Sequence, residues 1–277
     1  MTAVGHGTLY VVSTPIGHMG DFSFRAVETL RTVAAVLAED TRHSVHLLKR
    51  YDVSTPLIAY HEHNEAKSTP ALVARLLGGD SLALISDAGT PLLSDPGSRL
   101  VRAAVDAGVT VSPVPGASAL LAGLVASGLD VDRFTFYGFL PRKGGPRREV
   151  IADLVASRHA VVLYEAPPRV AETLQAIADA GGGGRAAAVG RELTKHFEET
   201  RRGTVADLAA YYSDAPPRGE IVIVIAGADV PMGATEDELR DRAAVLRAEG
   251  HSARDVATAL TIELGAARNL AYRLAHE

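Results

Sequence analysis

The sequence of 277 residues contains no cysteine. This absence excludes disulfides, thiolate zinc sites and cysteine nucleophiles, and it agrees with a reducing compartment. Apolar runs that approach membrane-spanning length are also missing. The first residues, MTAVGHGTLYVV, lack the basic segment and apolar stretch of a secretory signal. We therefore expect a cytoplasmic protein that does not contact a membrane.

An excess of positive charge is missing as well. The chain carries 28 Lys and Arg against 33 Asp and Glu, a net charge of −5, so the whole protein does not attract nucleic acid through its charge. An RNA partner would have to meet a local basic patch. The best candidate is PRKGGPRRE at 141–149, which is too rich in Gly and Pro to be a helix interior. This segment is either an RNA contact or simply a solvated loop.

Hydrophobic residues make up 47% of the chain and charged residues 22%, which is typical of a folded globular protein. Through residue 116, short apolar runs alternate with helical patterns, which predicts a mostly parallel sheet covered on both faces. A second series follows, in which consecutive strands around 186–203 predict a mixed sheet. We therefore expect an α/β fold with domains at 1–116 and 117–230, joined through a helix near 117–127.

The remaining residues, 231–277, form a predicted small helical tail of three short helices that break at Gly250 and Gly265. A helix-turn-helix arrangement fits this pattern. From Thr235 onward the tail carries six Lys and Arg against eight Asp and Glu, which argues against a grip on a phosphate backbone.

Ligands of a doubly wound sheet bind beyond the carboxyl ends of its strands, so the loops at those ends are the first candidates for a site. Four of them are dense in polar and turn-forming residues: STPIGHMGD (13–21), AEDTRHS (38–44), YHEHNE (60–65) and SDAGTPLLSDPG (86–97). In the last stretch, Asp95 and Pro96 fit the N-cap and the first position of the next helix. The turn itself does not require an aspartate at position 87. A carboxylate at 87 is suited to ribose hydroxyls or an amino group.

His61 and His63 raise the alternative of a metal site. Residues two apart, such as His61 and His63, point to the same side only where the chain is extended. No third ligand stands at a spacing from them that is typical of a metal site. We therefore expect no metal, and interpret these residues as polar walls of an active site.

Eight stretches together form a specific pattern. They are TPIGxxGD, LAEDTR, HEHN, SDAGTPLLSDPG, VPGASA (114–119), YEAPPR (164–169), RELTK (191–195) and GEIVIVI (219–225). In order and spacing they resemble the bacterial small-subunit ribosomal RNA methyltransferases that modify a cytidine ribose 2′-oxygen, a branch of the tetrapyrrole methylase superfamily. The resemblance covers about residues 8 to 227 and the tail. His18-Met19 and Pro168 depart from the usual residues of that branch.

The resemblance implies a tetrapyrrole-methylase-like fold of two α/β domains, with S-adenosylmethionine in the cleft between them. It also implies a homodimer and, as partner, 16S ribosomal RNA in the small ribosomal subunit. The cofactor contacts that it implies are Pro15, Asp87, Ala88, Gly89, Ser118, Ala119, Leu163, Pro217 and Gly219.

A ribose hydroxyl gains from a general base when it attacks a methyl group. The candidates for this catalytic role are Glu39, Asp40, His61, His63 and Glu165, and the sequence does not choose among them. Glu165 has the alternative of pairing with Arg169. The candidate RNA-binding cations are Arg42, Arg142, Lys143, Arg147, Arg148, Arg169, Arg191 and Lys195, for which ion pairs within the protein are the alternative.

Two other readings stay open at this point. One keeps the fold and cofactor but takes a tetrapyrrole or another small molecule as acceptor. The other is a non-catalytic protein that binds nucleic acid through its helical tail.

Overall fold

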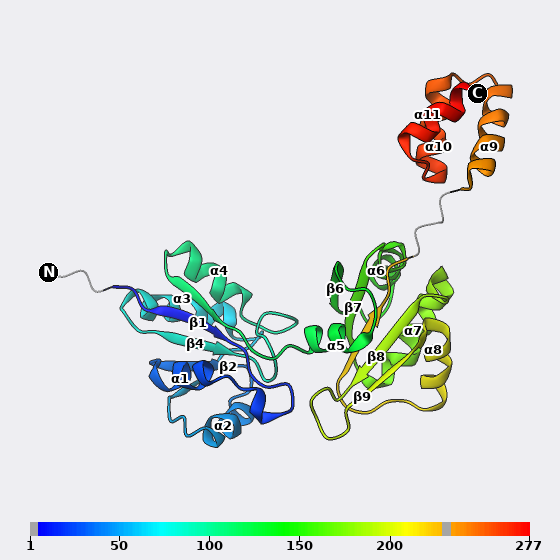
Figure 1. The fold of residues 1–277 in the computed structure, drawn as a ribbon. Helices are drawn as coiled ribbons and strands as arrows, with labels where there is room; N and C mark the ends of the chain where they lie inside the picture. The colour runs from blue at the N-terminus through cyan, green and yellow to red at the C-terminus, as the bar shows by residue number, and fades with distance from the viewer. Residues whose placement is uncertain (1–4, 229–233) are drawn as a thin grey trace. The chain divides into compact units, whose positions relative to one another are not determined.

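A computed structural model describes residues 5–228 and 234–277. The chain divides between Ala226 and Gly227 into a larger and a smaller compact unit. The larger unit contains two five-stranded sheets, one formed by the first half of the unit and one by the second (Figure 1).

The first sheet is entirely parallel and has the strand order β3-β2-β4-β1-β5. Its strands are β1 (Thr8–Val12), β2 (Ala35–Ala38), β3 (Leu57–Ala59), β4 (Leu82–Ile85) and β5 (Thr110–Val114). All residues of β2 and β4 are buried, as expected for strands covered on both faces. The parallel sheet predicted from the alternating pattern is thereby confirmed.

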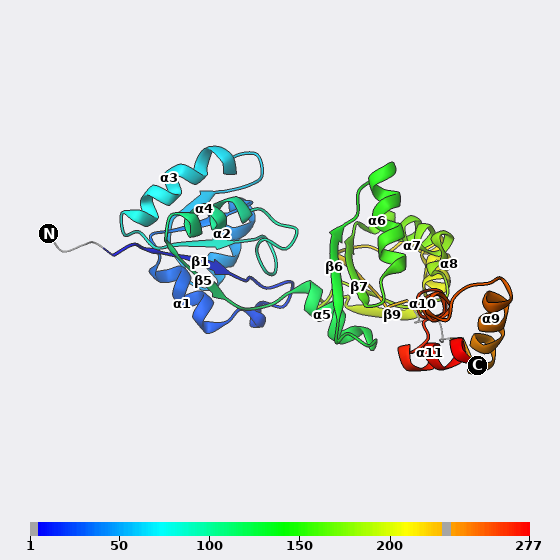
Figure 2. The same cartoon turned by 90° about the horizontal axis from the view of Figure 1, so that it is seen from above.

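Helices cover both faces of this sheet (Figures 1 and 2). Successive side chains of a strand point to opposite faces. Ala83 and Ile85 pack with α1 (Phe24–Thr32) and α2 (Thr41–Arg50). Leu82 and Leu84 pack on the other face with α3 (Glu65–Leu77) and α4 (Ser98–Asp106). A short 3-10 turn, η1 (Met19–Asp21), precedes α1.

The second sheet has the order β6-β7-β10-β8-β9 and is mixed, because β6 runs parallel to β7 and the other neighbours are antiparallel. Its strands are β6 (Phe134–Phe139), β7 (Ala160–Glu165), β8 (Ala186–Arg191), β9 (Glu199–Thr204) and β10 (Ile221–Ile225). No helix intervenes between β8 and β9, which the sequence predicted for 186–203.

One face of the second sheet packs against α6 (Gly145–Ala156), α7 (Val170–Ile177) and α8 (Val205–Asp214). Two short turns complete this side, η2 (Pro167–Arg169) and the π-helical η3 (Ala178–Gly182). The other face packs against α5 (Ala119–Ser127), whose Leu120 and Leu124 contact Val222 and Val224 of β10.

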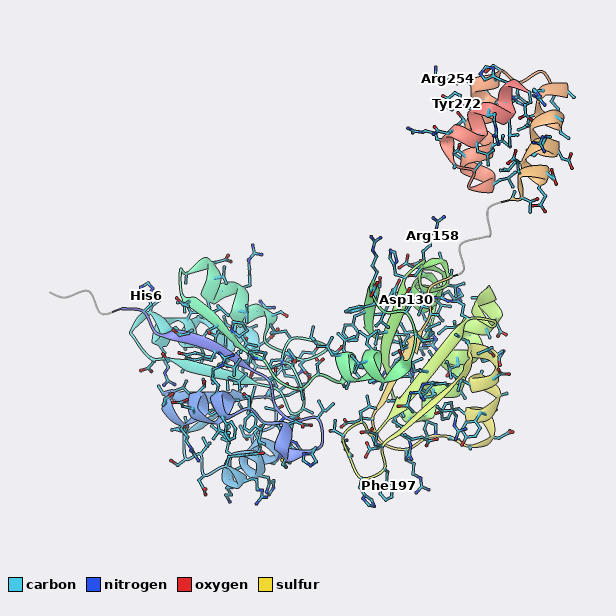
Figure 3. The ribbon with its side chains drawn as sticks, viewed as in Figure 1. His6, Asp130, Arg158, Phe197, Arg254 and Tyr272 are labelled. Atoms are coloured by element: carbon cyan, nitrogen blue, oxygen red, sulfur yellow. The ribbon has the colours of Figure 1, made fainter. Side chains whose placement is uncertain are left out.

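The smaller unit consists of α9 (Glu236–Ala248), α10 (Ala253–Leu264) and α11 (Arg268–His276). Thr235 and Glu238 form a reciprocal capping box at the start of α9, and Gly265 ends α10 in the left-handed conformation. Its core includes Leu239, Leu260 and Leu274, whereas Arg254 and Tyr272 lie at the surface (Figure 3).

The domain boundary predicted at 230/231 lies outside the described residues. Among the residues that the structure describes, no helix combines the length and apolar character needed to cross a bilayer.

Candidate active site

Three loops at the carboxyl edge of the first sheet are tied together. Thr14 and Gly89 exchange two backbone hydrogen bonds of 2.8 and 3.1 Å, which join the loops after β1 and β4. The hydroxyl groups of Ser13 and Thr90 lie 3.1 Å apart, and Thr90 donates to the carbonyl of Ala117 at 3.1 Å. The loops that follow β1, β4 and β5 therefore form one wall, as expected for neighbouring strands of a parallel sheet.

The second sheet approaches this wall closely at two glycines. The backbone N–H of His18 donates to the Thr194 hydroxyl at 3.0 Å, and a Cβ at Gly17 would lie 2.8 Å from that same hydroxyl oxygen. At Gly138, whose φ is +60°, a Cβ would lie 2.8 Å from the Ser94 hydroxyl oxygen. A side chain at either position would force these neighbouring groups to shift.

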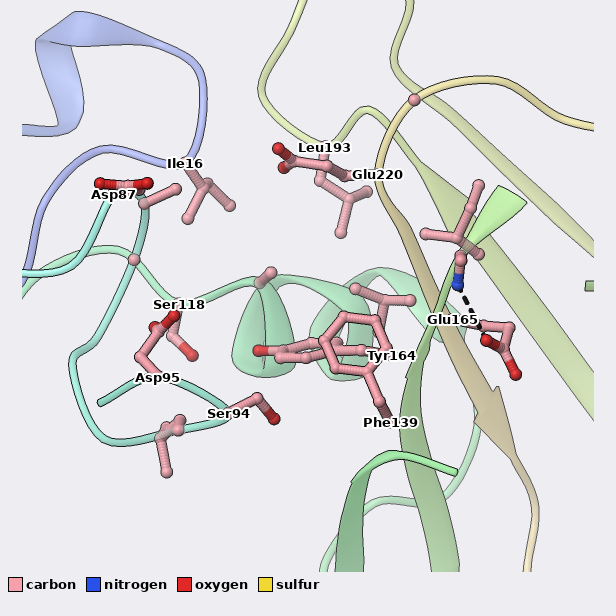
Figure 4. Close-up of a pocket in the computed structure, with 18 of the residues that line it drawn as sticks. Ile16, Asp87, Ser94, Asp95, Ser118, Phe139, Tyr164, Glu165, Leu193 and Glu220 are labelled. Carbon is pink, nitrogen blue, oxygen red and sulfur yellow. Dashed lines mark hydrogen bonds between the residues drawn. The ribbon is translucent and has the colours of Figure 1, made fainter. Parts of the chain in front are cut away.

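A cavity of about 410 Å³ lies between these elements (Figure 4). From the first half it is lined by Ile16, Asp87–Thr90 and Leu93–Asp95, and from the second by Ser118, Ala119, Phe139, Tyr164–Pro167, Leu193 and Gly219–Val222. Seven of the predicted site residues meet here. They are Asp87, Ala88, Gly89, Ser118, Ala119, Glu165 and Gly219.

Pro15, Leu163 and Pro217 do not line the cavity. Leu163 is fully buried in the core that faces α6, α7 and α8. Because side chains alternate along β7, the next residue, Tyr164, faces the cavity instead. The sequence named Leu163 as a cofactor contact; its side chain faces the core, and that of its neighbour Tyr164 lines the cavity.

Tyr164 anchors an aromatic group on this side of the cavity. Its hydroxyl oxygen accepts a 3.1 Å hydrogen bond from the backbone N–H of Leu120, at the start of α5. Its ring lies 4.9 Å from that of Phe136 and 5.7 Å from that of Phe139. Burial raises the pKa of the Tyr164 phenol, so it remains protonated at neutral pH.

The carboxylate of Glu165 belongs to a buried network rather than to the open cavity. It accepts hydrogen bonds from the Ala166 backbone N–H at 2.9 Å (Figure 4) and from the Thr173 hydroxyl at 2.6 Å. Arg169 Nη1 lies 3.4 Å away, and the Thr173 oxygen accepts in turn from Arg147 at 2.9 Å. The alternative foreseen for Glu165, a pair with Arg169, is thus present.

The other four catalytic candidates, Glu39, Asp40, His61 and His63, lie outside the cavity lining. Asp40 caps α2 and binds the Arg42 side chain at 2.8 Å, and this hydrogen bonding lowers its pKa to about 2. Burial is the main cause that raises the pKa of the Glu39 carboxyl. The neighbouring Asp87 carboxylate raises this pKa further, and His61 lowers it. These groups flank the Asp87 side of the cavity.

His61 and His63 pack edge to face, with ring centroids 6.0 Å apart. Within the described ranges, no three acidic or imidazole side chains come together as metal ligands would. The Nδ1 atom of His61 is buried and has no hydrogen-bond partner there.

Some of the candidate RNA-binding cations are exposed and others pair with acids of the protein; Arg42 does both, with a side chain that is 90% exposed. Arg142, Lys143 and Arg148 are exposed. Arg42 binds Asp40, Arg191 pairs with Glu199, and Lys195 pairs with Glu192 and Glu220.

Arg147 differs most from its predicted role, because its side chain is only 7% exposed. It lies in the first turn of α6 and donates to the Thr173 hydroxyl and to the Pro141 carbonyl. Arg169 donates to the same carbonyl at 3.3 Å and to that of Leu140 at 3.1 Å. Arg147 is therefore an anchor of the basic segment rather than one of its solvent-facing cations.

Sequence reasoning missed the apolar and aromatic walls, among them Ile16, Phe139, Tyr164 and Leu193. Ile16, Tyr164 and Leu193 lie inside recognised stretches, so membership of a stretch was a usable signal for them, whereas Phe139 lies outside all eight. Asp95 was interpreted as a helix cap, but the cap of α4 is Gly97, and Asp95 lines the cavity.

The two linked sheets and the cavity between them define an α/β protein of the tetrapyrrole methylase fold. The uroporphyrin-III-C-methyltransferase of Thermus thermophilus matches with a TM-score of 0.56 at 20% identity, over 79% of this chain and 94% of that one. A cobalt precorrin-4 methyltransferase gives a TM-score of 0.58 at 18% identity, with the same shares covered.

The chain belongs to the family described as Tetrapyrrole (Corrin/Porphyrin) Methylases, whose pattern matches residues 8–209. Within that family it is similar to proteins named Ribosomal RNA small subunit methyltransferase I. The protein of that name from Synechocystis sp. is 44% identical over 98% of both chains. The one from Mesorhizobium japonicum is 52% identical over 80% of this chain and 76% of its own.

Proposed function

We propose that this chain uses S-adenosylmethionine to methylate the ribose 2′-oxygen of a cytidine in 16S ribosomal RNA of the small subunit. The name shared by its relatives supports the RNA substrate. The observation that carries the proposal is a cavity of cofactor size with an exposed aromatic ring and exposed cations near it.

The cavity suits this methyl donor. Its volume of about 410 Å³ falls in the range of about 300–1,000 Å³ that small-molecule sites occupy. Asp87 and Asp95 place carboxylates beside a ligand that carries a positive sulfonium and an ammonium group. The faces of Tyr164 and Phe139 suit both a cation and a planar base. A related structure of the same fold is described as a complex with S-adenosylhomocysteine, at 17% identity.

S-adenosylmethionine supplies an electrophilic methyl group on a positively charged sulfur. In this proposal the loop residues Asp87, Gly89, Ser118 and Ala119 hold it from one side, and Gly219 holds it from the other. The protein then acts mainly by alignment of the ribose oxygen with the methyl carbon, which contributes much of the rate in such a transfer.

The side of the cavity at Phe139 is suited to a nucleotide. Phe139 is 55% exposed although it lines the cavity, and unstacked RNA bases commonly stack on exposed aromatic rings. Two residues further along, the segment with exposed Arg142 and Lys143 begins. Arg147 and Arg169 both bind the Pro141 carbonyl and so hold this segment in place.

A tetrapyrrole acceptor is the second candidate, because the fold is shared with enzymes that act on porphyrin and corrin precursors. Exposed cations beside an aromatic rim suit the carboxylates of such a substrate as well as the phosphates of RNA, so it is the name shared by the relatives that favours RNA. Parallel assays distinguish the RNA acceptor from the tetrapyrrole acceptor. The purified full chain is incubated with labelled S-adenosylmethionine and, in separate reactions, with small ribosomal subunits, naked 16S RNA or a uroporphyrinogen.

Label in RNA supports the proposal, and label only in the uroporphyrinogen would reject it. Light scattering of the same preparation checks the expectation of a homodimer, and fractionation of cells checks the expected cytoplasmic location.

A further inference from the structure

We propose that Phe139 is the platform on which the base of the target cytidine stacks after that nucleotide has left the stack of its RNA. This inference rests on the proposed function and names the residue that holds the acceptor nucleotide. Phe139 is the last residue of β6, and its ring lines the cavity beside Tyr164 (Figure 4).

The pairing of β6 with β7 shifts by one residue just before Phe139. Phe136 pairs with Val162. The next residue of β7, Leu163, pairs with Gly138 and not with the residue in between. One residue of β6 is therefore extra, as in a β-bulge, and Gly138 takes the left-handed conformation with φ of +60°. Glycine adopts this conformation without the steric cost of a Cβ.

This shift decides which face of the sheet Phe139 occupies. Side chains alternate along a regular strand, so without the extra residue Phe139 would point to the face that α6, α7 and α8 cover. Phe139 instead pairs with Tyr164, whose side chain lines the cavity. The extra residue, Tyr137, packs on the α6 side, and its hydroxyl donates to Asp153 of α6 at 2.7 Å. Bulges beside functional sites re-aim side chains in this way.

Neighbouring rings support Phe139 without covering it. Its ring centroid lies 5.7 Å from that of Tyr164, which in turn contacts Phe136 at 4.9 Å. The hydrogen bond from the Leu120 backbone N–H fixes the Tyr164 hydroxyl. Phe139 still remains 55% exposed. A large aromatic ring that is held in place and open to the cavity is suited to stack on another flat ring.

The cavity favours a single extruded nucleotide over a base within a duplex. In the proposed reaction the ribose oxygen must reach a methyl group inside a cavity of about 410 Å³. Enzymes that act on a nucleotide inside such a pocket take it out of its stack, which costs the stacking free energy of its base. An aromatic side chain restores part of that free energy, because every base has a face that can stack on it.

The position of Phe139 along the chain favours the RNA over the cofactor as the group that it contacts. The basic segment follows directly after β6, and its Arg142 and Lys143 are exposed and suited to the phosphates that flank an extruded nucleotide. The carboxylates suited to the positive charges of the cofactor, those of Asp87 and Asp95, come from the other half of the unit.

The test compares Phe139→Ala with Phe134→Ala, a matched change on the same strand at a ring that is 41% exposed and lies outside the cavity lining. We expect Phe139→Ala to lower kcat/KM on small subunits by about tenfold or more, the size expected when one base loses its stacking partner. The calorimetric Kd for S-adenosylhomocysteine should stay that of the wild type. Phe134→Ala should match the wild type in both measurements.

Two further replacements separate stacking from apolar volume. Phe139→Trp keeps a flat aromatic face and should retain most of the wild-type kcat/KM. Phe139→Leu keeps an apolar side chain without such a face and should be impaired like Phe139→Ala. Both replacements keep an apolar residue at this position, so their comparison serves if the Ala variant does not fold.

Phe139→Trp also reports on the cofactor, because the sequence contains no tryptophan. Its fluorescence should respond to S-adenosylhomocysteine no more than that of Phe134→Trp. Strong quenching at position 139 alone would show that the adenine of the cofactor stacks there, and would overturn the inference. Unchanged kcat/KM in Phe139→Ala, or equal activity of Phe139→Leu and Phe139→Trp, would overturn it as well. Failure of the wild type to methylate any RNA would instead reject the proposed function.

Discussion

The hydroxyl of Thr173 donates a 2.6 Å hydrogen bond to Oε2 of Glu165, and both side chains are buried. The same hydroxyl oxygen accepts from Arg147 at 2.9 Å. One threonine thus links an acid that borders the cavity to the arginine that anchors the basic segment. Each charged group would lose one of its buried hydrogen-bond partners without this bridge, so the network stabilises the fold around the site.

Thr173→Val should therefore lower the free energy of unfolding by about 2 kcal/mol, because it leaves two buried charged groups short of a partner. Since the Glu165 carboxylate is committed to this network, kcat of the folded variant should change little. Urea unfolding and initial rates measured on the same samples check both statements. Thr32→Val, at an exposed position of α1, is the control. A Thr173→Val protein of full stability would contradict the network's role.

The exposed cations of the basic segment should act on RNA affinity alone. We expect a variant with Ala at Arg142, Lys143 and Arg148 to bind small subunits more weakly. The slope of log affinity against log salt should flatten by about 0.7–0.9 for each RNA phosphate that the variant no longer neutralises. Filter binding across a salt series measures this slope.

Arg147→Ala provides the contrast, since its side chain is buried against Thr173. It should destabilise the protein by about 3 kcal/mol or more, because one partner of a buried network is removed. If instead Arg147→Ala weakened RNA binding without loss of stability, the assignment of Arg147 as an anchor would be wrong.

Asp87 should contribute to binding of the methyl donor. Its carboxylate lines the cavity and accepts from the backbone N–H of Asp40. Asp87→Ala should raise the Kd for S-adenosylmethionine about tenfold, which corresponds to about 1.4 kcal/mol, the size expected for a hydrogen bond to a charged group. Calorimetry measures the Kd for S-adenosylmethionine of Asp87→Ala and of the control variant Asp106→Ala, at the exposed end of α4. Equal Kd values for the two variants would show that Asp87 does not contribute to the binding site.

Asp95 should reduce the stability of the folded protein at alkaline pH. Its pKa is raised from 3.8 to about 6, so the folded state favours the protonated form. The part of the folding stability that depends on a protonated Asp95 is fully present below about pH 4 and is lost as the pH rises through about 6. Allowing for its partial exposure, Asp95→Asn should be more stable than the wild type by about 1 kcal/mol near pH 8.

This gain should shrink toward pH 4, where the wild-type carboxyl is protonated as well. Urea unfolding at the two pH values provides the comparison. A variant less stable than the wild type near pH 8 would indicate that Asp95 has a favourable partner that the structure does not contain.

The sheets and the position of the site follow from the sequence through general rules. Parallel strands bring their carboxyl ends to one edge, and so the stretches after β1, β4 and β5 could be expected to meet. Asp87, Gly89 and Ser118 do meet there.

The orientation of single side chains was less predictable. Asp95 turns into the cavity because Leu92 and Ser94 adopt a left-handed backbone, which residue type alone does not predict for non-glycine residues. Arg147 is buried because α7 places Thr173 opposite it, and contacts between elements so distant in sequence leave no local signal.

The most direct test of this account is to locate the methyl group that the enzyme adds. Small subunits from cells that lack the enzyme are incubated with the purified chain and labelled S-adenosylmethionine, and the RNA is digested and analysed by mass spectrometry. The account predicts label on the ribose 2′-oxygen of a cytidine in 16S RNA. Label on a base, or no label in RNA despite measured binding of the donor, would contradict it.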